Sequence, residues 1–383
     1  DTSDIEVFVR AIDNDDAVDP SPAYLLVPIK NTAPVAIFDT IQPIPDTTFV
    51  VTTFFLDVTD LDGNDNLDSI FFKVNNSPWY ALPPNTNTLT LAPQDPTVSG
   101  SAMADVFTGP EASLQPDPIS DLLLDGDNQV FLKAKDIAGS ESEVDTSEFF
   151  FVKRKTSDLL LVSANASTNP APSTVIDPAL QNINVDFDRI DLRVNGGLNV
   201  PTLWTPTFSF FINYYDQIFW YGDASNEALS LLENAAGAVQ AYLSQGGKML
   251  INMSFPNSFE NESVVLEFTP VDSLSTSTGS VRLPTDSLVY PVGNSALNYD
   301  TLKASVFVGA ATPFYVKSTA ETMFDAQLFI SGWVGPSSVI AKTTNGSGQT
   351  NLVFCSVELQ QLNGNPAGLE TFLNQVLLNE FNW

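Results

Sequence analysis

The sequence predicts a multidomain chain in which an all-β sandwich is followed by a three-layer α/β domain. Up to about residue 155, short strands alternate with turns rich in Pro, Asp and Gly, as is typical of a sandwich. Beyond residue 157, continuous apolar strands alternate with amphipathic helices, which favours a buried and largely parallel sheet. The length of 383 residues suits more than one domain.

The beginning of the chain resembles a later part of it. The segment VFVRAIDNDDAVD at 7–19 resembles VFLKAKDIAGSESEVD at 130–145, and a second strand follows each, at 24–29 and 148–152. This pattern predicts the terminal hairpin of a sandwich twice. Since no strands precede the first copy, we expect residues 1–31 to be the terminal hairpin of a truncated upstream domain.

Residues 32–155 supply the strands of one complete sandwich. Alternating or apolar runs occupy 34–38, 49–58, 69–74, 88–91 and 102–108, and proline-rich loops separate several of them. With the NTAP boundary at 31–34 and the VFLKAKD strand at 130–136, the segment resembles bacterial immunoglobulin-like and fibronectin type III-like modules. This resemblance implies an architecture and leaves the function open.

Residues 157–383 read as the α/β domain. We expect strands at 158–163, 187–192 and 216–222, then a helix at 227–245 that ends at Gly246 and Gly247, and a strand at 248–252. A strand at 351–357 and a helix at 368–378 close the domain. The segment 255–322 is rich in Ser, Thr and Pro and reads as an insertion with strands of its own.

Three motifs of this domain, LLLVS at 159–163, YDQIFWYGD at 215–223 and YLSQGGKMLI at 242–251, resemble class I glutamine amidotransferase-like domains. They resemble most the divergent, flavodoxin-like versions in secreted Bacteroidota proteins. The resemblance implies a cysteine nucleophile in the turn after 248–252, activated by a histidine. That turn reads NMSFP, and the chain contains no histidine. The resemblance therefore implies an inactive member without Cys-His-Glu chemistry.

The composition excludes several classes of partner. Acidic residues outnumber basic ones 46 to 15, giving a formal net charge of -31 that disfavours nucleic acids and anionic membrane surfaces. No apolar run approaches the ~18 residues of a transmembrane helix. The single cysteine, Cys355, cannot form an intramolecular disulfide and reads as a buried apolar side chain.

A cleft is expected where Asp223 and Glu227 follow a predicted central strand, because open α/β sheets bind ligands at the carboxyl ends of their strands. Ser254 could share that cleft. The alternatives are helix capping for the two acids and a structural role for the serine. The aromatic cluster at 204–221 could stack on glycans, although most of it should be core.

Two further motifs concern metal binding and export. Asp60, Asp62, Asn64 and Asp68 place oxygen ligands around Gly63, which suits calcium, whereas the alternative is a solvated turn. Asp followed by Ser or Thr recurs in a form that resembles the O-glycosylation motif of exported Bacteroidota proteins, with acceptors at Thr40, Thr47, Ser69, Ser273, Ser287 and Thr301.

Taken together, these features predict a non-catalytic extracellular or outer-membrane surface protein with protein or glycan partners, a component of a larger envelope assembly. A lipid anchor would belong to a part outside this chain. No cofactor is expected other than calcium. Two alternatives stay open: a hydrolase that acts through the carboxylates of Asp223 and Glu227, since paired acids need no histidine, and a calcium-dependent adhesin.

Overall fold

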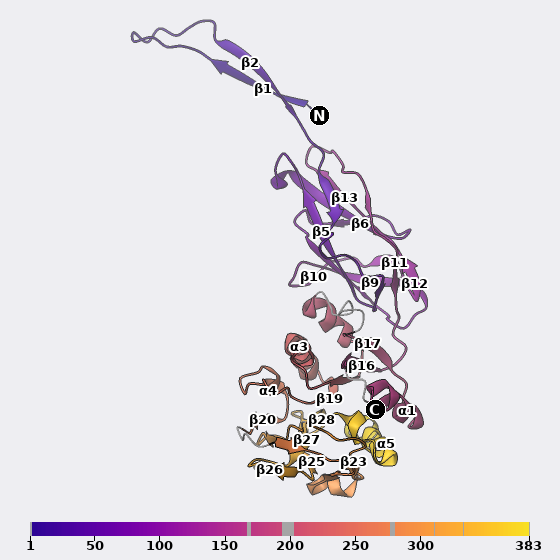
Figure 1. Ribbon diagram of the computed structural model, residues 1–383. Coiled ribbons are helices and arrows are strands. Elements are labelled where there is room, and N and C mark those ends of the chain that lie inside the picture. Colours follow the sequence, from indigo (N-terminus) through magenta and orange to yellow (C-terminus); the bar gives the residue numbers. More distant parts are fainter. Residues whose placement is uncertain are drawn as a thin grey trace. The chain divides into compact units, whose positions relative to one another are not determined.

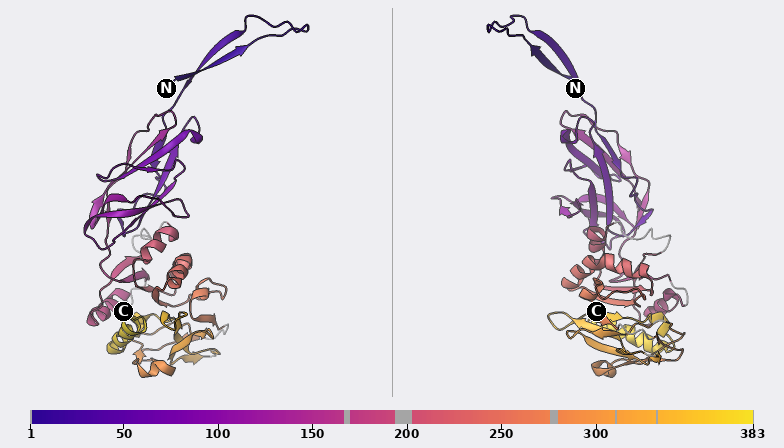
Figure 2. Two further views of the ribbon diagram at one scale, coloured as in Figure 1. Left: turned by 180° about the vertical axis from the view of Figure 1, so that it is seen from behind. Right: turned by 60° about the vertical axis from the view of Figure 1, so that its left-hand side comes forward.

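The computed structural model describes residues 2–166, 170–193, 203–275, 280–309, 311–331 and 333–382. Its regular structure is mostly β, arranged in several sheets (Figure 1). The chain divides into two compact units, Asp1–Lys153 and Arg154–Trp383. The first contains almost only strands, and the second combines strands with helices (Figure 2).

The chain begins with a two-stranded antiparallel hairpin of β1 (Thr2–Val9) and β2 (Ala23–Lys30). Among the described strands, no other strand is hydrogen-bonded to this pair. Every residue from 5 to 27 is exposed. The hairpin therefore has no apolar core of its own.

The rest of the first unit surrounds one apolar core. Alternate side chains point inward because a strand has a period of two, so β13 buries Val130, Leu132 and Ala134. Phe54 packs against both Phe72 and Phe150 at the centre. The strands are β3 (Val35–Phe38), β4 (Thr47–Thr48), β5 (Thr52–Thr59), β6 (Leu67–Val74), β7 (Tyr80–Leu82), β8 (Thr88–Pro93), β9 (Gly100–Thr108), β10 (Ser113–Leu114), β11 (Ile119–Leu124), β12 (Gly126–Asn128), β13 (Val130–Asp136), β14 (Asp145–Thr146) and β15 (Phe150–Val152).

A nine-stranded sheet forms the centre of the second unit, in the order β17-β16-β18-β19-β28-β27-β25-β22-β23. The first five strands run parallel and the rest antiparallel. The inner parallel strands β16 and β18 are buried along their whole length because both faces of the sheet are covered there, whereas the edge strand β17 buries only Ile190. Bounds are β16 (Leu159–Ala164), β17 (Asp188–Asp191), β18 (Gln217–Gly222), β19 (Lys248–Met253), β22 (Leu288–Pro291), β23 (Leu302–Lys303), β25 (Glu321–Ala326), β27 (Ser338–Thr344) and β28 (Thr350–Cys355).

Helices cover both faces of this sheet. On one face, α1 (Ile176–Asn182) and α5 (Pro366–Asn374) share a core with it. Figures 1 and 2 show α3 (Asn226–Ser244) on the other side, where α2 (Ser209–Ile212) also packs. Gly246 ends α3 at a φ of 97°, and a side chain at Gly247 would overlap the Tyr242 ring. The double glycine therefore permits a tight turn into β19.

The segment 255–322 is more closely tied to the sheet than the sequence suggests. Its strands β22 and β23 continue the central sheet beyond β25. The same segment contributes α4 (Val265–Phe268), β20 (Val271–Leu274), β21 (Ser280–Arg282) and β24 (Phe314–Val316), while residues 276–279 and 310 lie outside the described residues.

The closing helix predicted at 368–378 is present but divided. α5 continues into a wider π-helical stretch, Gln375–Glu380. In the described part of the chain, no helix combines the length and apolarity needed to span a membrane.

Candidate functional site

The carboxyl ends of β16, β18, β19 and β28 meet at one edge of the sheet because these strands are parallel and in register. Asp223 follows β18, Ser254 follows β19, and Ser356 to Glu358 follow β28. In open α/β sheets this edge is the usual position of a ligand site. A binding or catalytic site in this unit is therefore expected at this edge.

Asp223 accepts hydrogen bonds from three parts of the chain. Arg193 donates through Nη1 to both carboxylate oxygens at 2.9 Å, and the backbone N–H of Ala166 donates to Oδ2 at 2.9 Å. The hydroxyl of Ser225 also donates to Oδ1. The side chains of Asp223 and Arg193 are 14% and 15% exposed, so this pair is partly shielded from water.

Glu227 joins the same cluster from the first turn of α3. Arg193 reaches it through Nη2 at 2.5 Å, although the Glu227 side chain is 73% exposed. Ser225 caps the helix by accepting from the N–H of Ala228 at 3.1 Å. The structure thus brings the predicted acids Asp223 and Glu227 together, with Arg193 between them.

Ser254 has a different environment. It is 2% exposed, and its hydroxyl donates to the carbonyl of Ser356 at 2.9 Å. Thr312 donates to the same carbonyl at 3.1 Å. Within the described residues, Ser254 has no hydrogen bond with Asp223 or Glu227. A buried hydroxyl without a neighbouring base is a poor nucleophile.

The neighbouring polar groups also bond within the protein. Asn252 donates to the carbonyl of Val357 at 2.7 Å and accepts from the N–H of Leu359 at 2.9 Å. The Cys355 thiol donates to the Val357 carbonyl at 3.0 Å, and burial raises the pKa of Cys355 to about 12. The thiol is therefore protonated and unreactive at neutral pH, as expected for a buried structural cysteine.

Glu358 is a further acid at this edge that the sequence analysis did not single out. It is 6% exposed, and burial, with a smaller effect of the Asp223 charge, raises the pKa of Glu358 to about 7. Hydrogen bonds from Asn165 and Gln360 counteract part of this rise. The sequence does contain a signal for Glu358: an acid three residues after a buried parallel strand lies at the same sheet edge as Asp223.

The predicted calcium loop forms a hydrogen-bonded turn. Asp60 Oδ1 accepts from the N–H of Asp62 at 2.8 Å, and Asn64 Oδ1 accepts from the N–H of Asp60 at 3.0 Å. Asp62 bonds to the N–H of Thr32 at 2.6 Å, while Asp68 accepts from its neighbouring serine. The second Asp60 oxygen is buried without a partner. Among the described residues, no three Asp, Glu or Cys side chains lie close enough to hold one metal ion.

The predicted glycosylation positions and the aromatic cluster differ in their exposure to solvent. Of the six acceptors, Thr40 and Thr47 are exposed, and Ser69, Ser273, Ser287 and Thr301 are half-buried. The aromatic cluster is mainly core: Phe208, Phe211, Tyr215, Trp220 and Tyr221 are buried. This confirms the expectation that most of these rings support the sheet.

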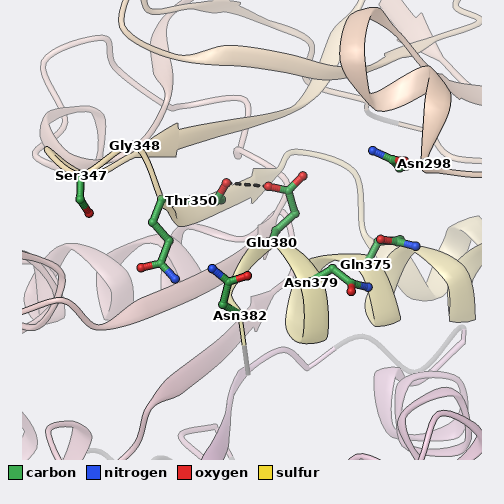
Figure 3. Close-up of a pocket in the computed structure, with 9 residues that line it drawn as sticks. Asn298, Ser347, Gly348, Thr350, Gln375, Asn379, Glu380 and Asn382 are labelled. Atoms are coloured by element: carbon green, nitrogen blue, oxygen red, sulfur yellow. Dashed lines mark hydrogen bonds between the residues drawn. The ribbon is translucent and has the colours of Figure 1, made fainter.

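At the opposite end of β28 lies a polar cavity of about 470 Å³. Figure 3 shows Gln375, Asn379 and Asn382 around it, with Glu380 hydrogen-bonded to Thr350. Glu380 also accepts from Lys342 at 2.8 Å and from Tyr299 at 3.2 Å. Its carboxylate is thus fully occupied by protein donors and acts as an anchor for the carboxy-terminal helix.

A second cavity, of about 480 Å³, lies in the first unit. Trp79 and Tyr80 line it together with Gln115, Asp117 and three prolines, Pro83, Pro116 and Pro118. Trp79 is 38% exposed, and the Tyr80 hydroxyl donates to the Asp117 carbonyl at 2.6 Å. Lys133 Nζ and Lys73 Nζ lie over the Trp79 ring, 5.2 and 6.0 Å from its centroid, and the part of the ring that stays exposed borders the cavity. A partly exposed aromatic ring with polar groups at its rim is suited to ligand binding.

No protein-family model matches the chain, and no curated protein matches it. A solved structure from Bacteroides fragilis, provisionally described as an alpha-galactosidase, is 12% identical, with a TM-score of 0.17. The alignment covers 61% of this chain, which spans about half (47%) of that one. A likeness this weak carries no argument about fold or activity.

Proposed function

We propose that this is a non-catalytic protein of the cell exterior that acts through binding surfaces, with glycan or protein partners at the cell envelope. The observation that carries the proposal is the internal bonding of the sheet edge. Among the described residues there, Asp223, Asn252, Ser254 and Cys355 all direct their polar groups at protein partners. The chain also has no histidine to activate a nucleophile.

The proposal includes the fold families suggested by the sequence. Numbered along the chain, the parallel strands β17-β16-β18-β19-β28 have the order 2-1-3-4-5, which is that of flavodoxin-like sheets. This order supports a divergent, inactive amidotransferase-like domain. For residues 32–153, antiparallel sheets around one core support an immunoglobulin-like or fibronectin type III-like sandwich.

The cavity at Trp79 is the surface that we assign to ligand binding, with glycans as the preferred class. An indole face packs on the C–H faces of a sugar ring, while the side-chain oxygens of Gln115 and Asp117 can accept hydrogen bonds from hydroxyls. The volume of about 480 Å³ falls within the usual range of small-ligand sites. The net charge of -31 favours neutral over anionic glycans.

This assignment is tested by retention on immobilised neutral β-glucan, mannan and xylan. We expect retention on at least one, and at least roughly a fivefold loss of affinity in Trp79→Ala, because removal of a stacking ring costs ~1–3 kcal/mol. Phe149→Ala is the matched control, since Phe149 is 64% exposed and does not line the cavity. Equal retention of all three proteins, or of none, would refute this glycan site.

A carboxylate-dependent hydrolase is the second candidate, favoured by Glu358. An acid with a pKa near 7 beside a second carboxylate is suited to general acid catalysis. The test is hydrolysis of nitrophenyl glycosides and esters by the native protein, Asp223→Asn and Glu358→Gln. We expect no turnover that depends on either acid. A loss of 100-fold or more in either variant would overturn the non-catalytic proposal.

A further inference from the structure

The turn after β1 has the same hydrogen bonds as the turn after β13, at a constant offset of 123 residues from Asp13 to Asp136. The N–H of Asp13 donates to the carbonyl of Ala17 at 3.1 Å, and that of Asp136 to Ser140 at 3.0 Å. In return, Asp13 Oδ1 accepts from the N–H of Ala17 at 2.9 Å, and Asp136 Oδ1 from that of Ser140 at 2.7 Å. In each turn, the same two residues are therefore joined by a backbone hydrogen bond and by a side-chain hydrogen bond.

The agreement extends through both loops as far as Asp19 and Ser142, beyond which the strand pairing differs by one residue. Residues at the fourth position of each turn have positive φ, 62° at Asp16 and 92° at Gly139. The N–H of Asp19 donates to the carbonyl of Ala11 at 2.9 Å, as does that of Ser142 to Ala134. Isolated bridges also match, between Ile12 and Val18 and between Lys135 and Glu141. Shared local sequence and shared turn geometry identify β1 as the structural counterpart of β13.

The surroundings of the two strands differ completely. Val130 and Leu132 of β13 are fully buried, and β13 is paired along its length with β6. Their counterparts Val7 and Val9 are 37% and 63% exposed. A two-stranded hairpin is at best marginally stable in water, and an apolar strand without a partner sheet invites association. The hairpin thus carries apolar residues at the positions that face the core in β13, but these residues are exposed.

We propose that β1 and β2 are the penultimate and last strands of a second sandwich module. The strands that cover them are equivalent to β3–β11 and are supplied by chain that precedes Asp1 in a longer polypeptide, since the counterpart of β12 is residues 3–5 of β1. Val7, Val9 and Ala11 face that core, as Val130, Leu132 and Ala134 do in the complete module, while Phe8 and Arg10 face outward. The inference does not rest on the ligand site proposed at Trp79, because it uses only the turns, the strand pairing and the exposure of the two hairpins.

A second copy of this chain does not provide the required partner. The strand that would pair with β1 is the counterpart of β6. In the described chain both edges of β6 are occupied, by β13 on one side and β7 on the other. Another copy therefore has no such edge to offer.

A chimera tests the proposal directly: residues 32–129 are joined to Val7 of the chain 7–383, which reproduces the junction before Val130. We expect hydrogen exchange of the amides at 8–12 to slow roughly 1,000-fold relative to the unextended chain. Because Val9 and Val27 replace the larger Leu132 and Phe150, a second chimera carries Val9→Leu and Val27→Phe to restore the core volume.

Matched variants of the chimera give the control. Val9→Asp should abolish the protection, whereas Arg10→Asp, at the outward position of Lys133, should preserve it. Rapid exchange at 8–12 in both chimeras would overturn the proposal. So would concentration-dependent dimerisation of the unextended chain that protects the same amides, because the partner would then be a second copy.

Discussion

At the scale of single residues, two acids at one sheet edge have opposite surroundings. Asp223 faces the guanidinium of Arg193 and the N–H of Ala166, both of which stabilise its charge. Glu358 is buried and, among the described residues, has no cation beside it, so its neutral form is favoured. The two carboxyl groups therefore have different partners, although they lie at the same sheet edge.

This difference predicts how stability depends on pH. The pKa of Glu358 is about 7 in the folded protein, above its usual 4.5, so the folded state holds the proton longer than the unfolded chain. Stability should therefore fall by about 3 kcal/mol as pH rises from 4.5 to 8. In Glu358→Gln this loss should disappear. Urea unfolding of the full chain at pH 5 and pH 8 measures both.

Glu262→Gln provides the control, because Glu262 is exposed in the same unit and should retain the native pH dependence. If Glu358→Gln loses stability between pH 5 and pH 8 as steeply as the native protein, Glu358 is not the buried neutral acid described above. The difference between Glu358→Gln and Glu262→Gln therefore isolates the contribution of Glu358.

The sequence identified two acids of this cluster, Asp223 and Glu227, and missed Arg193 and Glu358 for a physical reason. Asp223 directly follows an apolar strand, and the position alone indicates the sheet edge. Arg193 and Glu358 are 30 and 135 residues away from it, and only the pairing of β17, β16 and β28 into one sheet brings them close. Ser254 was correctly placed after β19, but its burial depends on the segment that carries Thr312.

At the scale of elements, the carboxy-terminal helix is held by Glu380. Burial alone would raise the pKa of Glu380, but hydrogen bonds from Lys342, Thr350 and Tyr299 outweigh it and lower that pKa. The stabilisation is therefore present above pH 4.5 and is lost as the pH falls below that value. These bonds connect the helix end to β27 and β28, so they attach it to the sheet.

Glu380→Gln should destabilise the protein by about 2 kcal/mol near neutral pH, because charge-assisted bonds from Lys342 are lost. Hydrogen exchange of the amides at 366–380 measures the loosening of the helix. Glu370→Gln is the control on the same helix, since its bond to Asn182 is exposed and should contribute little. Equal effects of the two substitutions would rule out Glu380 as the anchor.

The hydrogen bonds of the loop at 60–68 predict that a chelator does not change the thermal stability of the protein. Its oxygens from Asp60 Oδ1, Asp62 and Asn64 already accept backbone hydrogen bonds that close the turn. We therefore expect EDTA to leave the thermal midpoint unchanged. A fall of about 5 °C or more would instead support calcium at this loop and the adhesin alternative, with the unpaired Asp60 oxygen as its first ligand.

Elements with a strong local pattern were predictable, and those defined by distant partners were not. The apolar runs of β16, β18, β19 and β28 and the periodic helix α3 stand out in the sequence. By contrast, β22 and β23 have four and two residues and belong to the central sheet only through β25. Short strands on the antiparallel side carry no local signal that separates them from an insertion.

At the scale of the molecule, the chain combines a unit of strands that has an exposed hairpin with a unit of strands and helices whose central sheet edge is internally bonded. The first has the Trp79 cavity and an unpaired hairpin with an apolar face. In the second, the described residues at the edge satisfy one another. At this edge, the position that a nucleophile would occupy, Ser254, is closed to solvent.

The most direct test places a thiol at that position. Ser254→Cys should react with a thiol reagent at least roughly 100-fold more slowly than Asn257→Cys, which is exposed three residues further on. The native protein, whose only cysteine is buried, gives the background, and both variants should react equally in urea. Slow labelling of Ser254→Cys in the folded protein is the result predicted here. Labelling as fast as that of Asn257→Cys would mean that the edge is open, and the non-catalytic account would be contradicted.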